Sequence, residues 1–173
     1  MVLEHNIKEL GLERLREVLD YDPVTGHLIW RVSLSPRGVV GARAGCVKGG
    51  YRKITIDGVS YPASHIAWFH HYGKLPKGLV DHKNRNRDDN WIENLREATN
   101  SQNSYNMGRN SANTTGFKGV SKFYNPTNTA RFRAQIRVNG KRLFLGLFHT
   151  PEEAHEAYRK KAAELHGEFA RVT

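Results

Sequence analysis

The stretch from Asp81 to Asn106 concentrates side chains that can bind a metal ion and act on a phosphate. Asp81 and His82 are adjacent, a loop rich in Asn, Asp and Arg follows, and Asn103 comes after a short apolar segment. Hydrolysis of a phosphodiester needs a base for the attacking water and a cation for the leaving alkoxide. These residue types therefore predict a centre with one metal ion that hydrolyses phosphodiesters.

Each of the three groups has an expected role. Neighbouring residues on a strand point to opposite faces, so Asp81 is expected to hold a divalent ion and His82 to face the attacking water. A neutral imidazole, with a pKa of about 6.5, suits a base at neutral pH. The side-chain carbonyl of Asn103 would supply a second oxygen ligand. Mg²⁺ is the expected ion and Mn²⁺ the alternative, bound weakly until a DNA phosphate completes the shell.

The local order of elements supports this hypothesis over a solvated polar loop. Residues 79–82 and 95–98 read as the two strands of a small hairpin. Thr99 or Asn100 then caps a short helix that runs to about Met107. An Asp-His pair alone is more often structural than catalytic, but this order favours a nuclease.

The same residues resemble the HNH (ββα-metal) endonucleases. Asn94 follows His82 by twelve positions and Asn103 follows Asn94 by nine, and the segment IENLREATNSQNSYN is typical of the phage intron-type nicking enzymes. The resemblance covers roughly residues 12–107. It implies that Asp81 and Asn103 are metal ligands and that His82 is the general base. It also implies that Asn94 ties the loop to the helix and positions His82.

The residues before this motif predict further elements that support it. We expect a short amphipathic helix, a strand, a hairpin that turns at Asp57–Gly58, and a helix that begins after Ser64 as its N-cap and ends at Gly73. In order, their ranges are 8–19, 27–32, 51–63 and 65–72.

The residues after the motif predict a second, smaller unit. The polar segment 108–116 reads as a linker. Three strands follow, with a turn at Asn125–Thr129 and a hairpin turn at Asn139–Gly140, and then a helix begins at Pro151 and ends at His166. The expected strand ranges are 117–123, 130–138 and 141–148. The expected class is α+β: an N-terminal ββα-metal module with an added antiparallel hairpin in residues 1–107, and a three-stranded antiparallel sheet packed on one helix in residues 117–173.

One face of this second sheet is expected to be basic. Alternation places Phe132, Ala134, Ile136 and Val138 on one face of the central strand and Arg131, Arg133, Gln135 and Arg137 on the other. On the next strand, Leu143 and Leu145 should point inward, while Arg142 and Phe144 point outward. Residues 108–173 hold twelve Lys and Arg against five acids, and no acid occurs between Glu97 and Glu152. A polyanion is therefore the expected partner of the outward face.

The second unit also resembles the plant ethylene-response-factor (APETALA-type) DNA-binding domain, through GVSKF, FRAQIR, RLFLGLF and TPEEAHEAYRKKAAELHG. The resemblance implies that strand residues contact double-stranded DNA, namely Lys118, Gln135, Arg137, Arg142 and Phe144. Arg133 joins them because it lies on the same outward face. Phe144 stands where the plant forms have a tryptophan, so their sequence preference does not transfer.

The composition excludes several classes of protein. The chain has 173 residues and a net charge of +10, and its single cysteine, Cys46, excludes an internal disulfide and cysteine-based zinc sites. No apolar run reaches the ~18 residues that span a bilayer, so we expect a cytoplasmic protein with no membrane partner. The prediction is a nicking endonuclease that is a monomer, with a dimer as the alternative. A double-strand break would need dimerisation or two cleavage events, and by resemblance the protein is a phage homing enzyme. The alternatives are a DNA-binding regulator with an inactive nuclease module and an RNA-binding or packaging protein.

Overall fold

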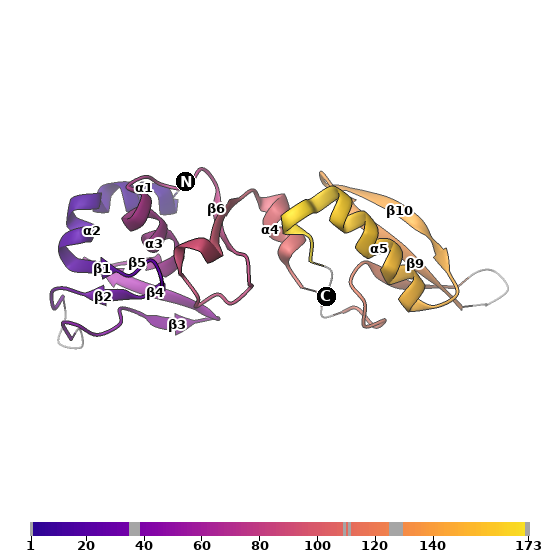
Figure 1. Ribbon diagram of the computed structural model, residues 1–173, viewed down its shortest axis with the longest axis horizontal. Helices are drawn as coiled ribbons and strands as arrows, with labels where there is room; N and C mark the ends of the chain where they lie inside the picture. Colours follow the sequence, from indigo (N-terminus) through magenta and orange to yellow (C-terminus); the bar gives the residue numbers. More distant parts are fainter. Residues whose placement is uncertain (1, 35–38, 109, 111, 125–129, 172–173) are drawn as a thin grey trace. The chain divides into compact units, whose positions relative to one another are not determined.

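The computed structural model describes residues 2–34, 39–108, 110, 112–124 and 130–171, which form two compact units (Figure 1). The first unit ends at Ala98 and the second begins at Thr99. The expected α+β class is confirmed, because both units combine helices with small antiparallel sheets. Within the described residues, no helix is long and apolar enough to cross a membrane.

The first unit holds three small antiparallel sheets, β1–β2, β3–β4–β5 and β6–β7. Its elements are α1 (Val2–Leu10), α2 (Leu12–Val18), β1 (Leu19–Tyr21), β2 (Leu28–Trp30), β3 (Cys46–Lys48), β4 (Tyr51–Ile56), β5 (Val59–Pro62), α3 (Ala63–Tyr72), β6 (Leu79–His82), the 3₁₀ helix η1 (Ile92–Asn94) and β7 (Leu95–Ala98). The strands predicted for the nuclease hairpin, residues 79–82 and 95–98, are confirmed.

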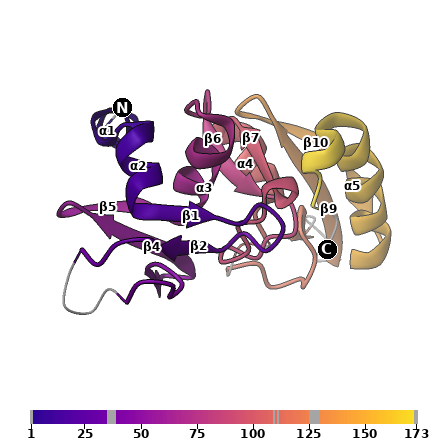
Figure 2. The same ribbon diagram turned by 60° about the vertical axis from the view of Figure 1, so that its left-hand side comes forward.

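The N-terminal helix differs from the prediction. Instead of one helix over residues 8–19, α1 and α2 are separated at Gly11, whose φ of 71° is a conformation that glycine adopts without strain. Figure 2 shows α2 followed directly by β1, a strand that the helical pattern concealed. The tertiary pairing of β1 with β2 gives these residues an extended partner that local periodicity does not reveal.

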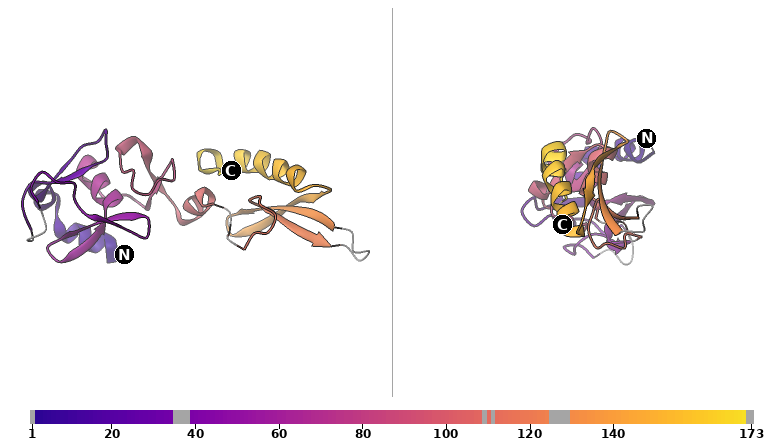
Figure 3. Two further views of the ribbon diagram at one scale, coloured as in Figure 1. Left: turned by 90° about the horizontal axis from the view of Figure 1, so that it is seen from below. Right: turned by 90° about the vertical axis from the view of Figure 1, so that its right-hand side faces the viewer.

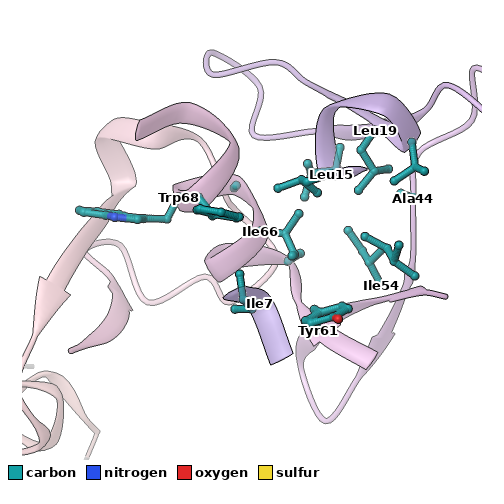
Figure 4. Packing of buried hydrophobic residues seen from close by; sticks show 14 of the residues in the cluster. Ile7, Leu15, Leu19, Ala44, Ile54, Tyr61, Ile66 and Trp68 are labelled. Atoms are coloured by element: carbon teal, nitrogen blue, oxygen red, sulfur yellow. The ribbon is translucent and has the colours of Figure 1, made fainter. Parts of the chain in front are cut away.

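The core of the first unit lies between these helices and the β3–β4–β5 sheet (Figure 4). Ile54 and Ile56 are fully buried, as their alternation predicts, and they share a cluster with Ile66 of α3. The Asp57–Gly58 turn has positive φ at both positions, the geometry that a two-residue hairpin needs. Gly73 ends α3 in the left-handed conformation as expected, but Ser64 is not its N-cap, because the helix begins at Ala63 after Pro62.

The second unit packs one helix against one sheet. Figure 3 shows α5 lying along a face of the antiparallel β8–β9–β10 sheet. Its elements are α4 (Asn100–Asn106), β8 (Val120–Tyr124), β9 (Ala130–Val138), β10 (Lys141–Phe148), α5 (Pro151–His166) and the 3₁₀ helix η2 (Gly167–Phe169). Thr150 caps α5 through a reciprocal pair with Glu153, and Pro151 occupies its first turn.

One detail of this sheet corrects the predictions, because the first strand begins at Val120 rather than at residue 117. Leu143 pairs with Ile136 and so shares the inward face as expected, although it is 43% exposed because β10 is an edge strand. The predicted turn at Asn125–Thr129 lies outside the described residues.

The predicted domain boundaries stay a prediction. Thr99 caps α4 as expected, through a capping box with Gln102. However, α4 belongs to the second unit, whereas the prediction counted it with the nuclease part.

Candidate active site

The β6–β7 hairpin carries the two central residues of the site. Asp81 lies opposite Arg96 in the strand register, and His82 lies opposite Leu95. Both side chains are buried, with 6% and 4% of their surface exposed. Because adjacent strand residues point to opposite faces, the carboxylate and the imidazole lie on two sides of one short strand.

The carboxylate of Asp81 is bound by Arg96. Nε and Nη2 of Arg96 donate hydrogen bonds to Oδ2 of Asp81 at 3.0 and 2.9 Å. A buried carboxylate is stable only when its charge is compensated, so this cross-strand pair both stabilises Asp81 and fixes its orientation. Arg96 was not predicted as a site residue, although pairing the two predicted strands end to end places it opposite Asp81.

His82 is oriented by Asn90. Its Nε2 lies 3.1 Å from Oδ1 of Asn90, which is only 1% exposed, and Nδ2 of Asn90 donates to the carbonyl of Asp88 at 3.2 Å. That second bond sets the amide so that its oxygen faces the ring, and an amide oxygen only accepts. Nε2 of His82 therefore carries the proton, and Nδ1 is the nitrogen with the basic lone pair.

Burial lowers the pKa of His82, although the hydrogen bond to Asn90 and the charge of Asp81 act in the opposite direction. The imidazole is therefore neutral at neutral pH, the state that a general base requires. Asn90 was not predicted as a site residue, because nothing in its spacing separates it from the other Asn residues of the loop.

Asn94 ties the two ends of the loop between β6 and η1. Its Oδ1 accepts from the backbone N–H of Asn84 at 2.9 Å, and its Nδ2 donates to the carbonyl of Asp89 at 2.7 Å. Its own carbonyl accepts from the N–H of Lys83, the residue after His82. Asn94 thus closes the loop that follows His82 and carries Asn90, and its catalytic role stays a prediction.

The loop is also anchored to the β3–β4–β5 sheet. Arg52 of β4 donates to both carboxylate oxygens of Asp88, at 2.7 and 3.1 Å, and Arg43 donates to Oδ1 at 3.2 Å. Burial alone would raise the pKa of Asp88, but the hydrogen bond from Arg52 and the two positive charges lower it overall. Asp88 is therefore ionised, and its carbonyl receives the Asn90 side chain.

A turn near the N-terminus supports the far end of the loop. The hydroxyl of Tyr21 donates to the carbonyl of Asn90 at 2.8 Å, and the N–H of Ile92 donates to the carbonyl of Pro23 at 3.1 Å. Gly26 has a φ of 71°, and a Cβ there would lie 2.1 Å from the backbone nitrogen of Trp91. This position accepts only glycine, so the turn and the loop meet backbone to backbone.

The predicted metal ligands are oxygen donors, which suit a hard divalent cation. Asp81 lies on β6 of the first unit, and Asn103 lies half-buried on α4 of the second. Over the described ranges, no group of three or more His, Cys, Asp and Glu side chains gathers around a possible metal position. The assignment of Asp81 and Asn103 as ligands stays a prediction.

The outward face of the second sheet has the predicted basic character. Arg142 pairs with Arg137, and Phe144, which is 56% exposed, pairs with Gln135. An open groove crosses this face, and its lining includes four of the predicted DNA contacts, Arg133, Gln135, Arg137 and Arg142.

An irregularity between Phe144 and Gly146 shifts the strand register of β10 against β9. As a result, Leu147 lies opposite Arg133 and joins Phe144 on the outward face.

Lys118 has a different position from the other predicted DNA contacts. Its ammonium donates to the carbonyl oxygens of Tyr105 and Met107, at 2.5 and 2.8 Å, at the C-terminal end of α4. A cation at a helix C-terminus stabilises the helix, so these bonds give Lys118 a structural role. Its contact with DNA stays a prediction.

Comparison with known proteins agrees with this geometry. Residues 61–105, which include β6, the loop, β7 and most of α4, match the HNH endonuclease family. The chain is 34% identical over 112 residues to Protein 3.8 of Escherichia phage T7, an alignment that covers 64% of this chain and 89% of that protein. It is 35% identical over 99 residues to a protein named as an HNH endonuclease in Acanthamoeba polyphaga mimivirus, covering 57% of this chain and 49% of that protein. No solved structure matches the chain at a significant level.

Proposed function

Because the chain belongs to the family of Protein 3.8 of phage T7 and matches the HNH endonucleases over residues 61–105, we propose that it is a metal-dependent DNA endonuclease. The observation that carries the proposal is the buried imidazole of His82, which burial keeps neutral and Asn90 orients, next to the buried carboxylate of Asp81. A fixed neutral base beside an acid, followed by a loop that is anchored at three places, is suited to hydrolysis of a phosphodiester.

In the proposed reaction, Nδ1 of His82 takes a proton from a water molecule as its oxygen bonds to phosphorus. The bond from phosphorus to the leaving sugar oxygen breaks, and that oxygen finally takes a proton from solvent. The imidazolium that forms donates a stronger hydrogen bond to Asn90 than the neutral ring does, so Asn90 stabilises the developing charge. Asp81 and Asn103 would hold the divalent cation, which neutralises charge on the leaving oxygen when it is bound.

The second unit is proposed to hold the DNA duplex. Its groove gathers Arg133, Gln135, Arg137 and Arg142 on the outward sheet face, with Phe144 exposed beside them. A β-sheet edge or ribbon can enter the major groove, where Arg suits guanine and Gln suits adenine. The likeness to the ethylene-response-factor domain supports the same use of this face.

One active site acts on one strand, so the proposed enzyme nicks duplex DNA, and the proposed biological role is that of a phage homing enzyme. The test uses supercoiled plasmid with Mg²⁺, with Mn²⁺ and with EDTA. The wild-type protein should produce open-circular DNA before linear DNA in the presence of either metal, and no product in EDTA.

His82→Ala should abolish cleavage while retaining DNA binding. His5→Ala is a matched control, because His5 is an exposed histidine on α1 that pairs with Glu9. If wild-type protein and His82→Ala bind the plasmid equally and neither cuts it, the protein is a DNA-binding regulator and the enzyme proposal fails.

A further inference from the structure

One arginine beside the active site has an aromatic rather than an acidic partner. Arg43 and Arg52 bind Asp88, and Arg96 binds Asp81. The guanidinium carbon of Arg87 instead lies 4.6 Å from the centre of the Tyr51 ring. Among the residues that the structure describes, no carboxylate pairs with Arg87, and its side chain is exposed.

Tyr51 connects this arginine to the catalytic histidine. It is the first residue of β4, and its ring centre lies 6.4 Å from that of His82. Arg87, Tyr51 and His82 therefore form a series that begins at the surface and ends at the buried imidazole.

Stacking on Tyr51 determines which atoms of Arg87 remain available to bind a ligand. A guanidinium that lies over an aromatic ring uses its planar face, while its N–H donors point outward in the plane of the group. Those donors match the oxygens of a phosphate, to which arginine binds through two parallel hydrogen bonds. Because the ring already restricts the long side chain, less conformational entropy is lost when an anion binds.

We propose that Arg87, stacked on Tyr51, binds a backbone phosphate of the nucleic acid and holds it beside His82. This inference rests on the proposed function, since it assigns the phosphate contact of the same active site. Tyr51 is then a positioning residue that acts through Arg87. Arg43, Arg52 and Arg96 do not serve this purpose, because their guanidinium groups are bound to carboxylates.

The first test measures binding without cleavage. Affinity for a fluorescent DNA duplex is measured in EDTA over a range of NaCl concentrations, with the wild-type protein, Arg87→Ala and Lys8→Ala. Loss of one phosphate contact should reduce the slope of log K against log [salt] by about 0.9 for Arg87→Ala. Lys8→Ala removes the same charge from the exposed face of α1 and should keep the wild-type slope.

The second test measures single-turnover cleavage at saturating protein. Arg87→Ala should lower the rate constant by about tenfold or more, as expected for loss of a charged contact of ~1.4 kcal/mol or more in the transition state. Tyr51→Ala should lower it by a smaller factor, and Tyr51→Phe, which keeps the aromatic face, should retain more of the rate than Tyr51→Ala.

The outcomes separate this inference from the proposed function. A wild-type salt slope for Arg87→Ala overturns the inference even if the wild-type protein cleaves DNA. Equal rates for Tyr51→Ala and the wild type would overturn the positioning role of the ring. If the wild-type protein does not cleave at all, the enzyme proposal fails, while the salt slope still decides whether Arg87 binds a phosphate.

Discussion

Replacing Asn90 with alanine tests how the active site orients its base. Asn90 is 1% exposed, and its side chain forms two hydrogen bonds, one from His82 and one to the carbonyl of Asp88. The substitution removes the acceptor for the Nε2 proton of His82. Leaving a buried donor without its acceptor costs about 1–3 kcal/mol, so the folded protein should lose stability by that amount.

The effect on the rate follows from the charge that forms on His82. A neutral hydrogen bond contributes about 0.5–1.5 kcal/mol and one to a charged group about 1.5–3 kcal/mol, so the bond to Asn90 strengthens by about 1–2 kcal/mol as the imidazolium forms. This difference corresponds to roughly a 5-fold to 30-fold lower rate constant. Free rotation of the unanchored ring lowers the rate further, so we expect a loss of about 10-fold to 100-fold.

The assay is single-turnover nicking of supercoiled plasmid at saturating protein and Mg²⁺, with the DNA dissociation constant measured separately. Asn84→Ala is the matched control, because Asn84 lies in the same loop and its side chain also forms two hydrogen bonds, to Asp89 and from Asn86. Those bonds are exposed and do not involve His82, so this variant should cut at nearly the wild-type rate. If Asn90→Ala cuts as fast as Asn84→Ala, then Asn90 does not orient the base.

Three further predictions concern the support of the site and the stability of the first unit. Arg96→Met should lower the free energy of unfolding in urea by about 3–5 kcal/mol, because it removes the guanidinium that compensates the buried Asp81, and adding Asp81→Asn should recover part of the loss. A smaller loss from Arg96→Met than from the double variant would contradict this reasoning. Gly26→Ala should reduce nicking and thermal stability together, because its Cβ would collide with the backbone of Trp91 and displace the loop; unchanged nicking would show that the loop adapts. His70 lies on α3, and its Nε2 is 3.1 Å from the carbonyl oxygen of Leu19. Burial lowers the pKa of His70, so the unfolded chain takes up a proton at a higher pH than the folded protein does, and the unfolding free energy should fall as the pH drops below about 6.5. His70→Gln should flatten this pH dependence in urea titrations, and an unchanged slope would show that His70 does not contribute to it.

The elements with a clear local pattern were predictable to the residue. The alternation of apolar residues in 51–56 and 130–138, with the turns Asp57–Gly58 and Asn139–Gly140, specified two hairpins that the structure confirms. Such patterns suffice because strand direction and turn conformation are set by neighbouring residues. The split at Gly11 and the strand β1 were missed, because the pairing of β1 with β2 overrides the helical spacing of residues 8–19.

The sequence by itself determined which groups the candidate site can use: one acid, one imidazole and two amides at the spacing of an HNH motif, followed by a basic sheet. Only the tertiary structure decided which residues hold these groups in place. Arg96 meets Asp81 across a hairpin, and Asn90 meets His82 across a loop. Arg52 anchors that loop through Asp88, which lies 36 residues further along the chain. Residue type and spacing fix which reactions are possible, whereas the partner of a buried charge depends on which distant segments pack together.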